Sequence, residues 1–169
     1  MLLKARIAIT VILCLGLFSV NSALALSDKE TDEILNSCEA VFKAMKDSNY
    51  RKLWSLITPE SKETIVKDTY KELDKAGVIT SRDNITSDFE ECGSMCRSYW
   101  KGFLKSFKPD AALMDSKWAM GDVSGKEAEI IITYKKSQQP ARVKMVKIDG
   151  LWKMGLTETF WTRKSLFFW

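Results

Sequence analysis

The sequence predicts an α+β fold in which N-terminal helices pack on one face of an antiparallel sheet. Apolar residues recur at helical spacing from about residue 28 to residue 107, and from about residue 114 they alternate with polar residues. Asp149-Gly150 then supplies the residue types that tolerate the positive φ angles of a tight hairpin turn. Because the strands follow the helices without a linker, we expect a single domain over residues 26–169.

The first 25 residues have the three parts of a secretory signal peptide. Lys4 and Arg6 precede an apolar run over residues 7–20, and a small-x-small triplet ends at Ala25. The apolar run is shorter than the roughly 20 residues of a membrane-spanning helix. We therefore expect a secreted or periplasmic protein, cleaved near Ala25, with no stable membrane span afterwards. An uncleaved N-terminal anchor is the alternative.

The charge balance argues against a nucleic-acid partner. Cleavage removes two of the 26 basic residues, so 24 basic residues face 22 acidic ones and the net charge is +2. Nucleic-acid binding needs a strong basic patch, which such a small excess does not supply. We expect a small apolar ligand or a protein partner instead, and a homodimer is left open.

We expect four amphipathic helices before the strands, and the first three of them end near Gly77. A capping box at Ser27-Asp-Lys-Glu30 opens the first helix. A short second helix follows over residues 50–57, and Pro59 suits the first turn of a third helix that ends near Gly77. The apolar stripes of these helices provide cover for a sheet.

The last helix is expected to begin at a second capping box, residues 87–90, and its apolar stripe runs to Pro109. Cys92 and Cys96 both lie on this stripe. Side chains four residues apart on a straight helix have Cβ atoms about 5–6 Å apart, whereas a disulfide needs about 3.5–4.5 Å. The two cysteines are therefore poor partners for each other on such a helix.

Cys38, on the stripe of the first helix, is the expected disulfide partner of Cys96, with Cys92 as the alternative partner. The alternatives to this disulfide are three buried free thiols, a strained Cys92–Cys96 bond, intermolecular pairing and a reactive Cys92. The chain has four cysteines, of which Cys14 lies in the predicted signal peptide, and the other three make a weak metal site in a chain without histidine. We expect neither a metal nor another cofactor.

Even-numbered positions form the apolar face of the predicted strands. The run over residues 141–148 begins with apolar odd positions and finishes with apolar even ones, which predicts a bulge. After the Asp149-Gly150 turn, the even face continues as a strand to near the end of the chain. The face begins at Met114 and comprises Trp118, Met120, Ala128, Ile130, Ile132, Tyr134, Trp152, Met154, Leu156, Glu158 and Phe160.

This order of elements, with the pattern AEIIITY…ARVKMVKIDGLWKMG, resembles the nuclear transport factor two-like superfamily over residues 28–161. The resemblance implies a cystatin-like cone fold, in which a curved antiparallel sheet wraps around a long helix and leaves a tapering pocket. Enzymes of the superfamily generally use an acid or base, often Asp or His, inside the cone. This chain has no histidine, so no catalytic residue carries over.

We expect the concave face of the sheet to bind a small apolar or amphipathic ligand or a protein partner, without catalysis. The candidate ligand-binding residues are Trp118, Met120, Tyr134, Trp152 and Glu158. A carboxylate on an apolar face has a raised pKa and can act as an acid or base, so a lyase or isomerase that uses Glu158 is the alternative. In the other interpretation, Glu158 lies at a strand end and reaches water.

The segment SLFFW, residues 165–169, places three aromatic residues close together. We expect it to add a last half-strand to the sheet, or to present an apolar surface to a partner or a membrane. The sequence leaves its role open.

Overall fold

The structure, a computed structural model, describes residues 27–137 and 139–160. The predicted signal peptide and the SLFFW segment lie outside the described residues. Within these residues, no helix is both long enough and apolar enough to span a bilayer. The helices are α1 (Asp28–Lys46), α2 (Tyr50–Leu56), α3 (Pro59–Lys75), α4 (Arg82–Glu91), α5 (Ser94–Ser106), α6 (Pro109–Met114) and α7 (Leu156–Phe160). The strands are β1 (Ser116–Ser124), β2 (Glu127–Tyr134), β3 (Ala141–Ile148) and β4 (Leu151–Gly155).

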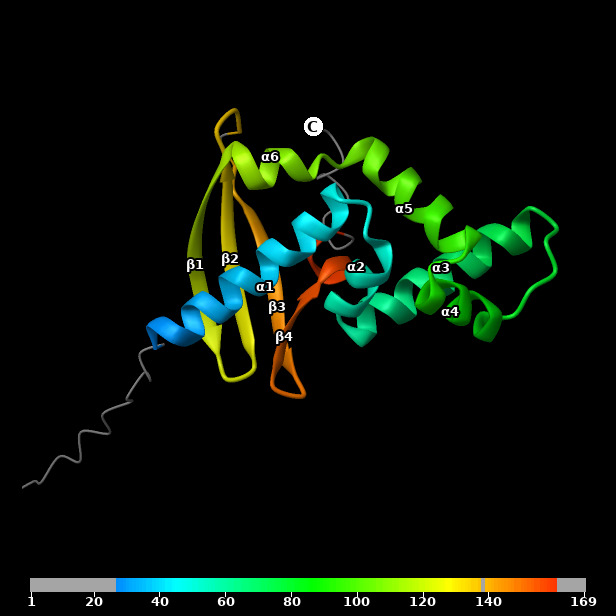
Figure 1. The fold of residues 1–169 in the computed structure, drawn as a ribbon, viewed down its shortest axis with the longest axis horizontal. Coiled ribbons are helices and arrows are strands. Elements are labelled where there is room, and N and C mark those ends of the chain that lie inside the picture. Colours follow the sequence, from blue (N-terminus) through cyan, green and yellow to red (C-terminus); the bar gives the residue numbers. More distant parts are fainter. Residues whose placement is uncertain (1–26, 138, 161–169) are drawn as a thin grey trace, which may run out of the picture.

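The strands form one antiparallel sheet in the order β1-β2-β3-β4, and α1 lies across one of its faces (Figure 1). The predicted α+β class, with helices packed on a sheet, is confirmed. At the β3–β4 turn, Asp149 and Gly150 have φ angles of 52° and 78°. This turn pairs Ile148 with Leu151, so the predicted tight hairpin is confirmed.

The core lies between α1 and the inner face of the sheet. Cross-strand pairs keep this face continuous, because Ile130 pairs with Val143 and Met145 pairs with Met154. All four side chains are buried. The helix contributes its own stripe, made of Ile34, Cys38, Val41, Phe42, Ala44 and Met45. The prediction that helices cover the apolar face of the sheet is confirmed.

The irregularity in the sheet lies in β1 and not in β3. The register of β1 shifts between Met120 and Val123, so that Val123 pairs with Ala128. In β3 the pairing is regular on both sides, and the predicted bulge over residues 141–148 is therefore wrong. The apolar Val146 lies on the outer face of the strand, where it is half-buried.

Two segments predicted as strand are helical. Met114 ends α6, which Pro109 begins, and its side chain is exposed. The predicted strand after residue 155 is also wrong, because Leu156 starts α7 directly after β4. Leu156 and Phe160 are four residues apart, so they share a face in a helix as well as in a strand. The sequence spacing alone therefore does not separate the two cases.

The start of the first helix agrees with prediction, whereas the start of the last one does not. The hydroxyl of Ser27 accepts a hydrogen bond from the backbone N–H of Glu30 at 3.2 Å. The second capping box, at residues 87–90, is wrong, because Ser81 caps α4 and accepts from the N–H of Asn84 at 3.2 Å. The long last helix is divided into α4 and α5.

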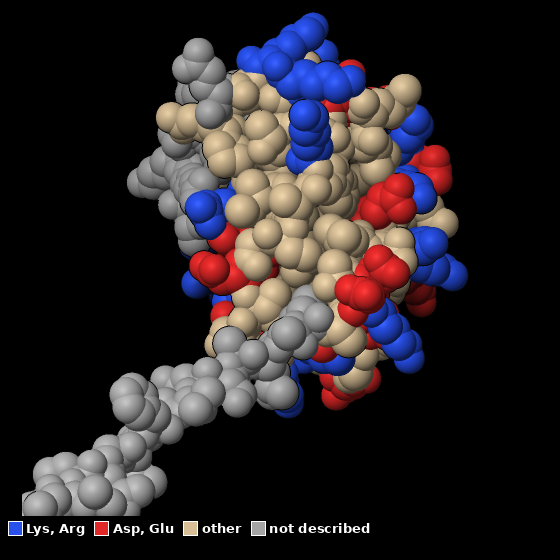
Figure 2. Space-filling view, turned by 90° about the vertical axis from the view of Figure 1, so that its left-hand side faces the viewer, with Lys and Arg blue, Asp and Glu red and all other residues tan. Residues whose placement is uncertain are grey.

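The outer face of the sheet carries charged side chains. Arg142 pairs with Glu129, and Lys144 pairs with Glu127 at 2.8 Å. Figure 2 shows the side of the molecule that carries β1, with uncharged surface in the centre and charged residues around it. Lys and Arg gather at the top of this view, where the β2–β3 turn lies in Figure 1.

Ile130 and Ile79 offer a matched test of the core. Ile130 is fully buried on β2, whereas Ile79 is fully exposed after α3. We expect Ile130→Ala to lower the free energy of unfolding by about 3 kcal/mol, because it removes buried apolar volume. Ile79→Ala should change it by less than about 0.5 kcal/mol. Urea denaturation followed by circular dichroism measures both, and equal effects would contradict the placement of the core.

Candidate functional site

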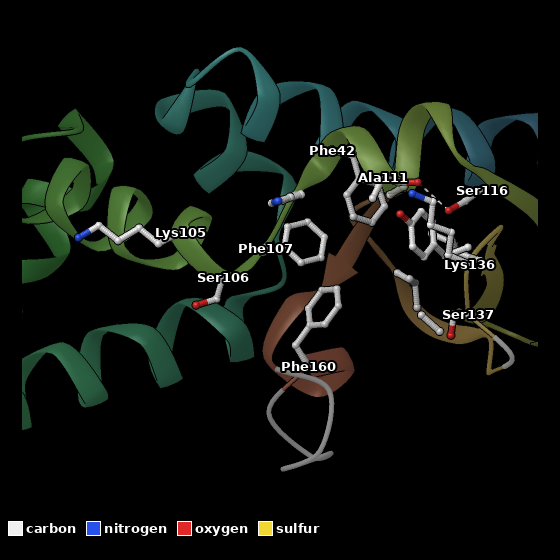
Figure 3. Close-up of a pocket in the computed structure, with 15 residues that line it drawn as sticks. Phe42, Lys105, Ser106, Phe107, Ala111, Ser116, Lys136, Ser137 and Phe160 are labelled. Atoms are coloured by element: carbon white, nitrogen blue, oxygen red, sulfur yellow. Dashed lines mark hydrogen bonds between the residues drawn. The ribbon is translucent and has the colours of Figure 1, made fainter. Parts of the chain in front are cut away.

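A cleft of about 850 Å³ opens at one end of the sheet (Figure 3). Its sheet wall comes from the inner face, where Ile132 and Val143 line it, together with Tyr134. Helices α1, α6 and α7, the end of α5, the chain between α5 and α6, and the turn after β2 supply the other walls. Both apolar and polar side chains contribute to this lining.

Three phenylalanines from distant parts of the chain form the apolar part of the cleft. The rings of Phe42 and Phe107 stack with their centroids 5.9 Å apart, and Phe160 meets Phe107 edge to face at 5.3 Å. The three labelled rings lie next to one another in Figure 3. Phe107 reaches this place because the chain leaves α5 there in an extended conformation, with φ at −117°, before Pro109 begins α6.

The rest of the cleft is polar and positively charged. Among the described residues that line it are three lysines, and none is acidic. Lys105 points away from the phenylalanine rings in Figure 3. The candidate ligand-binding cations of the cleft are therefore Lys108 and Lys136. Neither forms an ion pair within the described part of the chain. The nearby carboxylates of Asp110 and Asp115 are paired with other lysines, Lys46 and Lys135.

The structure brings one of the predicted ligand-binding residues, Tyr134, to the cleft. Trp118 packs edge to face on Phe42 at 5.5 Å, and its indole N–H donates to the carbonyl of Ala112 at 2.8 Å. Met120 lies on the inner face of β1, half-buried. Trp152 is buried, with the ammonium of Lys147 5.4 Å from its ring centroid. Trp118, Met120 and Trp152 therefore belong to the core and its edge.

Glu158, the fifth candidate, lies on α7 in a cluster of hydroxyl groups. Thr58 donates to Oε1 of Glu158 at 2.9 Å, and Ser61 donates to Oε2 at 2.6 Å. Thr157 donates to Oε2 at 2.9 Å. Thr58 and Ser61, both fully buried, belong to the first turn of α3 and its N-cap. The carboxylate therefore ties the start of α3 to the end of the sheet.

The hydrogen bonds keep Glu158 ionised. Burial raises the pKa of Glu158, but hydrogen bonds from Ser61, its own backbone, Thr157 and Thr58 lower it by more, so that the net pKa lies below its usual value. A general acid at neutral pH needs a raised pKa, which is the opposite direction. The ionised carboxylate of Glu158 therefore suits a structural role, in which it anchors α7 to the start of α3, better than the role of an acid catalyst.

No disulfide is formed among the described residues, where Cys38, Cys92 and Cys96 are free thiols. The expected Cys38–Cys96 bond stays a prediction. The sulfur atom of Cys96 lies 3.0 Å from that of Cys92.

Phe107, Lys108 and Lys136 line the cleft but were not predicted as site residues from the sequence. For Phe107 and Lys108, the sequence feature that could have indicated this position is Pro109, because the residue before a proline disfavours the helical conformation and the helix therefore ends there. Phe107 then turns from the helix stripe into the cleft. Lys136 follows the end of β2, and only the folded sheet places it beside residues of α6.

No protein-family model matches the sequence, and no curated protein or solved structure matches it significantly. The resemblance to the nuclear transport factor two-like superfamily therefore stays a prediction.

Glu158→Gln tests the hydroxyl cluster. A carboxyl whose pKa is lowered by folding stabilises the fold fully above its usual value of 4.5, and the contribution is lost as the pH falls through the lowered pKa. We expect the variant to be less stable than the unmodified protein by about 1.5 kcal/mol at pH 7. The difference should shrink steadily below pH 4.5. Urea denaturation from pH 7 to pH 3 measures it.

Glu63→Gln is the matched control, because Glu63 is an exposed carboxylate on the same helix as Ser61. It should change stability little at any pH in this range. A Glu158→Gln effect that is the same at pH 7 and pH 3 would contradict an ionised, hydrogen-bonded Glu158.

Proposed function

We propose that this protein is an exported binding protein that holds an amphipathic ligand with an anionic group in the cleft. The observation that carries the proposal is the combination of a phenylalanine cluster with two lysines that form no ion pair within the described residues. A volume of about 850 Å³ is within the range of small-molecule sites, which is about 300–1,000 Å³. The proposal keeps the binding role expected from the sequence and gives it a place at the end of the sheet.

The apolar part of the ligand would lie against Phe42, Phe107 and Phe160. Aromatic rings offer large, rigid apolar surfaces, so burying an alkyl or aryl group there releases water without ordering many side chains. Ile132 and Val143 extend this surface along the sheet. An apolar group of this kind would gain about 25 cal/mol per Å² of area removed from water.

The anionic group would lie toward Lys108 and Lys136. An ammonium group on a flexible stem can follow a ligand headgroup while its methylene carbons cover apolar surface. Because none of the described lining residues is acidic, an anion entering the cleft meets no opposing carboxylate in that lining. The hydroxyl groups of Ser116 and Ser137 also line the cleft, where they donate to the carbonyls of Ala111 at 2.7 Å and Gln139 at 3.0 Å.

Binding of dodecanoate, compared with its uncharged methyl ester, tests the proposed function. We expect dodecanoate to bind more tightly than the ester, and Lys108→Gln/Lys136→Gln to weaken dodecanoate binding about tenfold, which corresponds to about 1.4 kcal/mol. Rising salt should weaken the binding as well. Isothermal titration calorimetry below the micelle concentration measures the affinities.

Two further variants separate the cleft from general surface effects. Lys101→Gln/Lys117→Gln removes the same charge from two exposed lysines that do not line the cleft, and should leave the affinity unchanged. Ala111→Phe fills the cleft from α6 without altering its charge, and should abolish binding of both probes. If neither the cleft lysines nor Ala111→Phe alters binding, the proposed site is wrong.

Processing of the full chain tests the proposed export. Expressed with its own first 25 residues in a bacterium, the protein should be recovered with Leu26 at its N-terminus, because the small residues Ala23 and Ala25 precede the cleavage site in the small-x-small pattern. Intact mass measurement reads the N-terminus directly. Ala25→Arg should block this cleavage, and recovery of the unmodified protein starting at Met1 in the membrane fraction would favour an uncleaved anchor.

A further inference from the structure

Cys92 and Cys96 lie at a break between two helices. α4 ends at Glu91, Cys92 adopts the left-handed conformation with φ at 56°, and α5 begins at Ser94. The expectation of one straight helix is therefore wrong. The break brings the two sulfur atoms to 3.0 Å from each other, with the thiol of Cys96 directed at Cys92.

Contacts with neighbouring residues hold this break in place. The carboxylate of Asp88 accepts from the backbone N–H of Cys96 at 2.7 Å, and the guanidinium of Arg97 donates to the carbonyl of Cys92 at 2.6 Å. The N–H of Gly93 donates to the Asp88 carbonyl at 2.7 Å. A Cβ atom at Gly93 would lie 2.0 Å from an Asp88 carboxylate oxygen, so a larger residue there would displace the carboxylate that holds the N–H of Cys96. The proximity of the thiols is thus built into the junction.

The two thiols differ in access. Cys92 is half-buried and Cys96 is fully buried, as is Cys38 on α1. Burial first, and the neighbouring Cys92 second, raise the pKa of the Cys96 thiol. Cys92 is therefore the sulfur that an external reagent meets first, and Cys96 is the sulfur positioned to react with it next.

We propose that Cys92 and Cys96 are a redox-modification site, which closes to an intrachain disulfide by exchange with an external disulfide such as glutathione disulfide. This inference rests on the geometry of the junction and is independent of the cleft. It favours the Cys92–Cys96 pairing over the Cys38–Cys96 bond expected from the sequence.

The exchange takes place in two balanced steps. The Cys92 thiol loses its proton, and its sulfur attacks one sulfur of the external disulfide. A mixed disulfide forms, and the other half leaves and takes up a proton. The Cys96 thiol then loses its proton and attacks the Cys92 sulfur, which releases the second half as a thiol. The two protein thiols are oxidised, and the external disulfide is reduced to two thiols.

The tryptic map of this chain distinguishes the possible pairings. Trypsin cuts after Arg82 and Arg97, so one peptide, residues 83–97, contains both Cys92 and Cys96. Cys38 lies in another peptide, residues 30–43. An intrachain Cys92–Cys96 bond lowers the mass of a single peptide by two hydrogen atoms, whereas a bond to Cys38 joins two peptides.

The experiment uses the folded mature chain, equilibrated with glutathione disulfide, then blocked with N-ethylmaleimide and mapped by mass spectrometry. We expect peptide 83–97 to lose two hydrogen atoms and Cys38 to stay reduced. In a separate reaction with the reduced protein, Cys92 should be alkylated at least about tenfold faster than Cys96. A peptide joined to residues 30–43, or two thiols that stay reduced, would overturn the proposal.

Three substitutions complete the test on the folded protein. Cys96→Ser should stop the reaction at the first step and leave glutathione attached to Cys92, whereas Cys92→Ser should lose both the mixed disulfide and the bond. Cys38→Ser should form the Cys92–Cys96 bond as before. A Cys96→Ser protein that takes up no glutathione at Cys92 would overturn the proposed order of attack.

Discussion

The burial of one face of the sheet against α1 is the constraint on which the rest of the structure depends. Phe42 makes this clear, because its ring meets Trp118 of the sheet edge to face at 5.5 Å and stacks on Phe107 at 5.9 Å. Phe42 thus belongs both to the core and to the wall of the cleft. Since α1 fixes Phe42 and the sheet fixes Ile132 and Val143, the walls of the cleft are set by the packing of the domain.

Long periodic segments and local capping signals made most of the fold predictable from the sequence. The Ser27 cap, the Thr58-Pro59 helix start and the Asp149-Gly150 turn each depend on hydrogen bonds or dihedral angles within a few residues. The break at Cys92 was missed because apolar spacing continues on both sides of it. Apolar periodicity indicates which face of a helix is buried, but it does not indicate that one residue within the stripe has a left-handed backbone conformation.

The candidate site was less predictable, since it depends on residues that are distant in the sequence. Tyr134 was identified from strand alternation, but Lys108 and Phe107 come from the junction of α5 and α6. Glu158 shows most clearly why the properties of the site could not be predicted from the sequence. Its apolar neighbours in the sequence suggested a raised pKa, whereas the hydroxyls of Thr58 and Ser61, 100 and 97 residues away, lower it. Electrostatic environment is a property of the fold and not of the local pattern.

Helix α5 carries the two proposed features at opposite ends. Its first turn holds Cys96, while a run of ring contacts leads from Trp100 through Phe103 to Phe107, with centroids 5.8 Å and 5.5 Å apart. The thiol pair is held by Asp88, Arg97 and backbone groups, whereas the cleft is formed largely by rings and lysines from other elements. A shared helix does not by itself couple two sites, because coupling needs an element with two arrangements that both sites bias. The thiols and the cleft are therefore separate features on a common support.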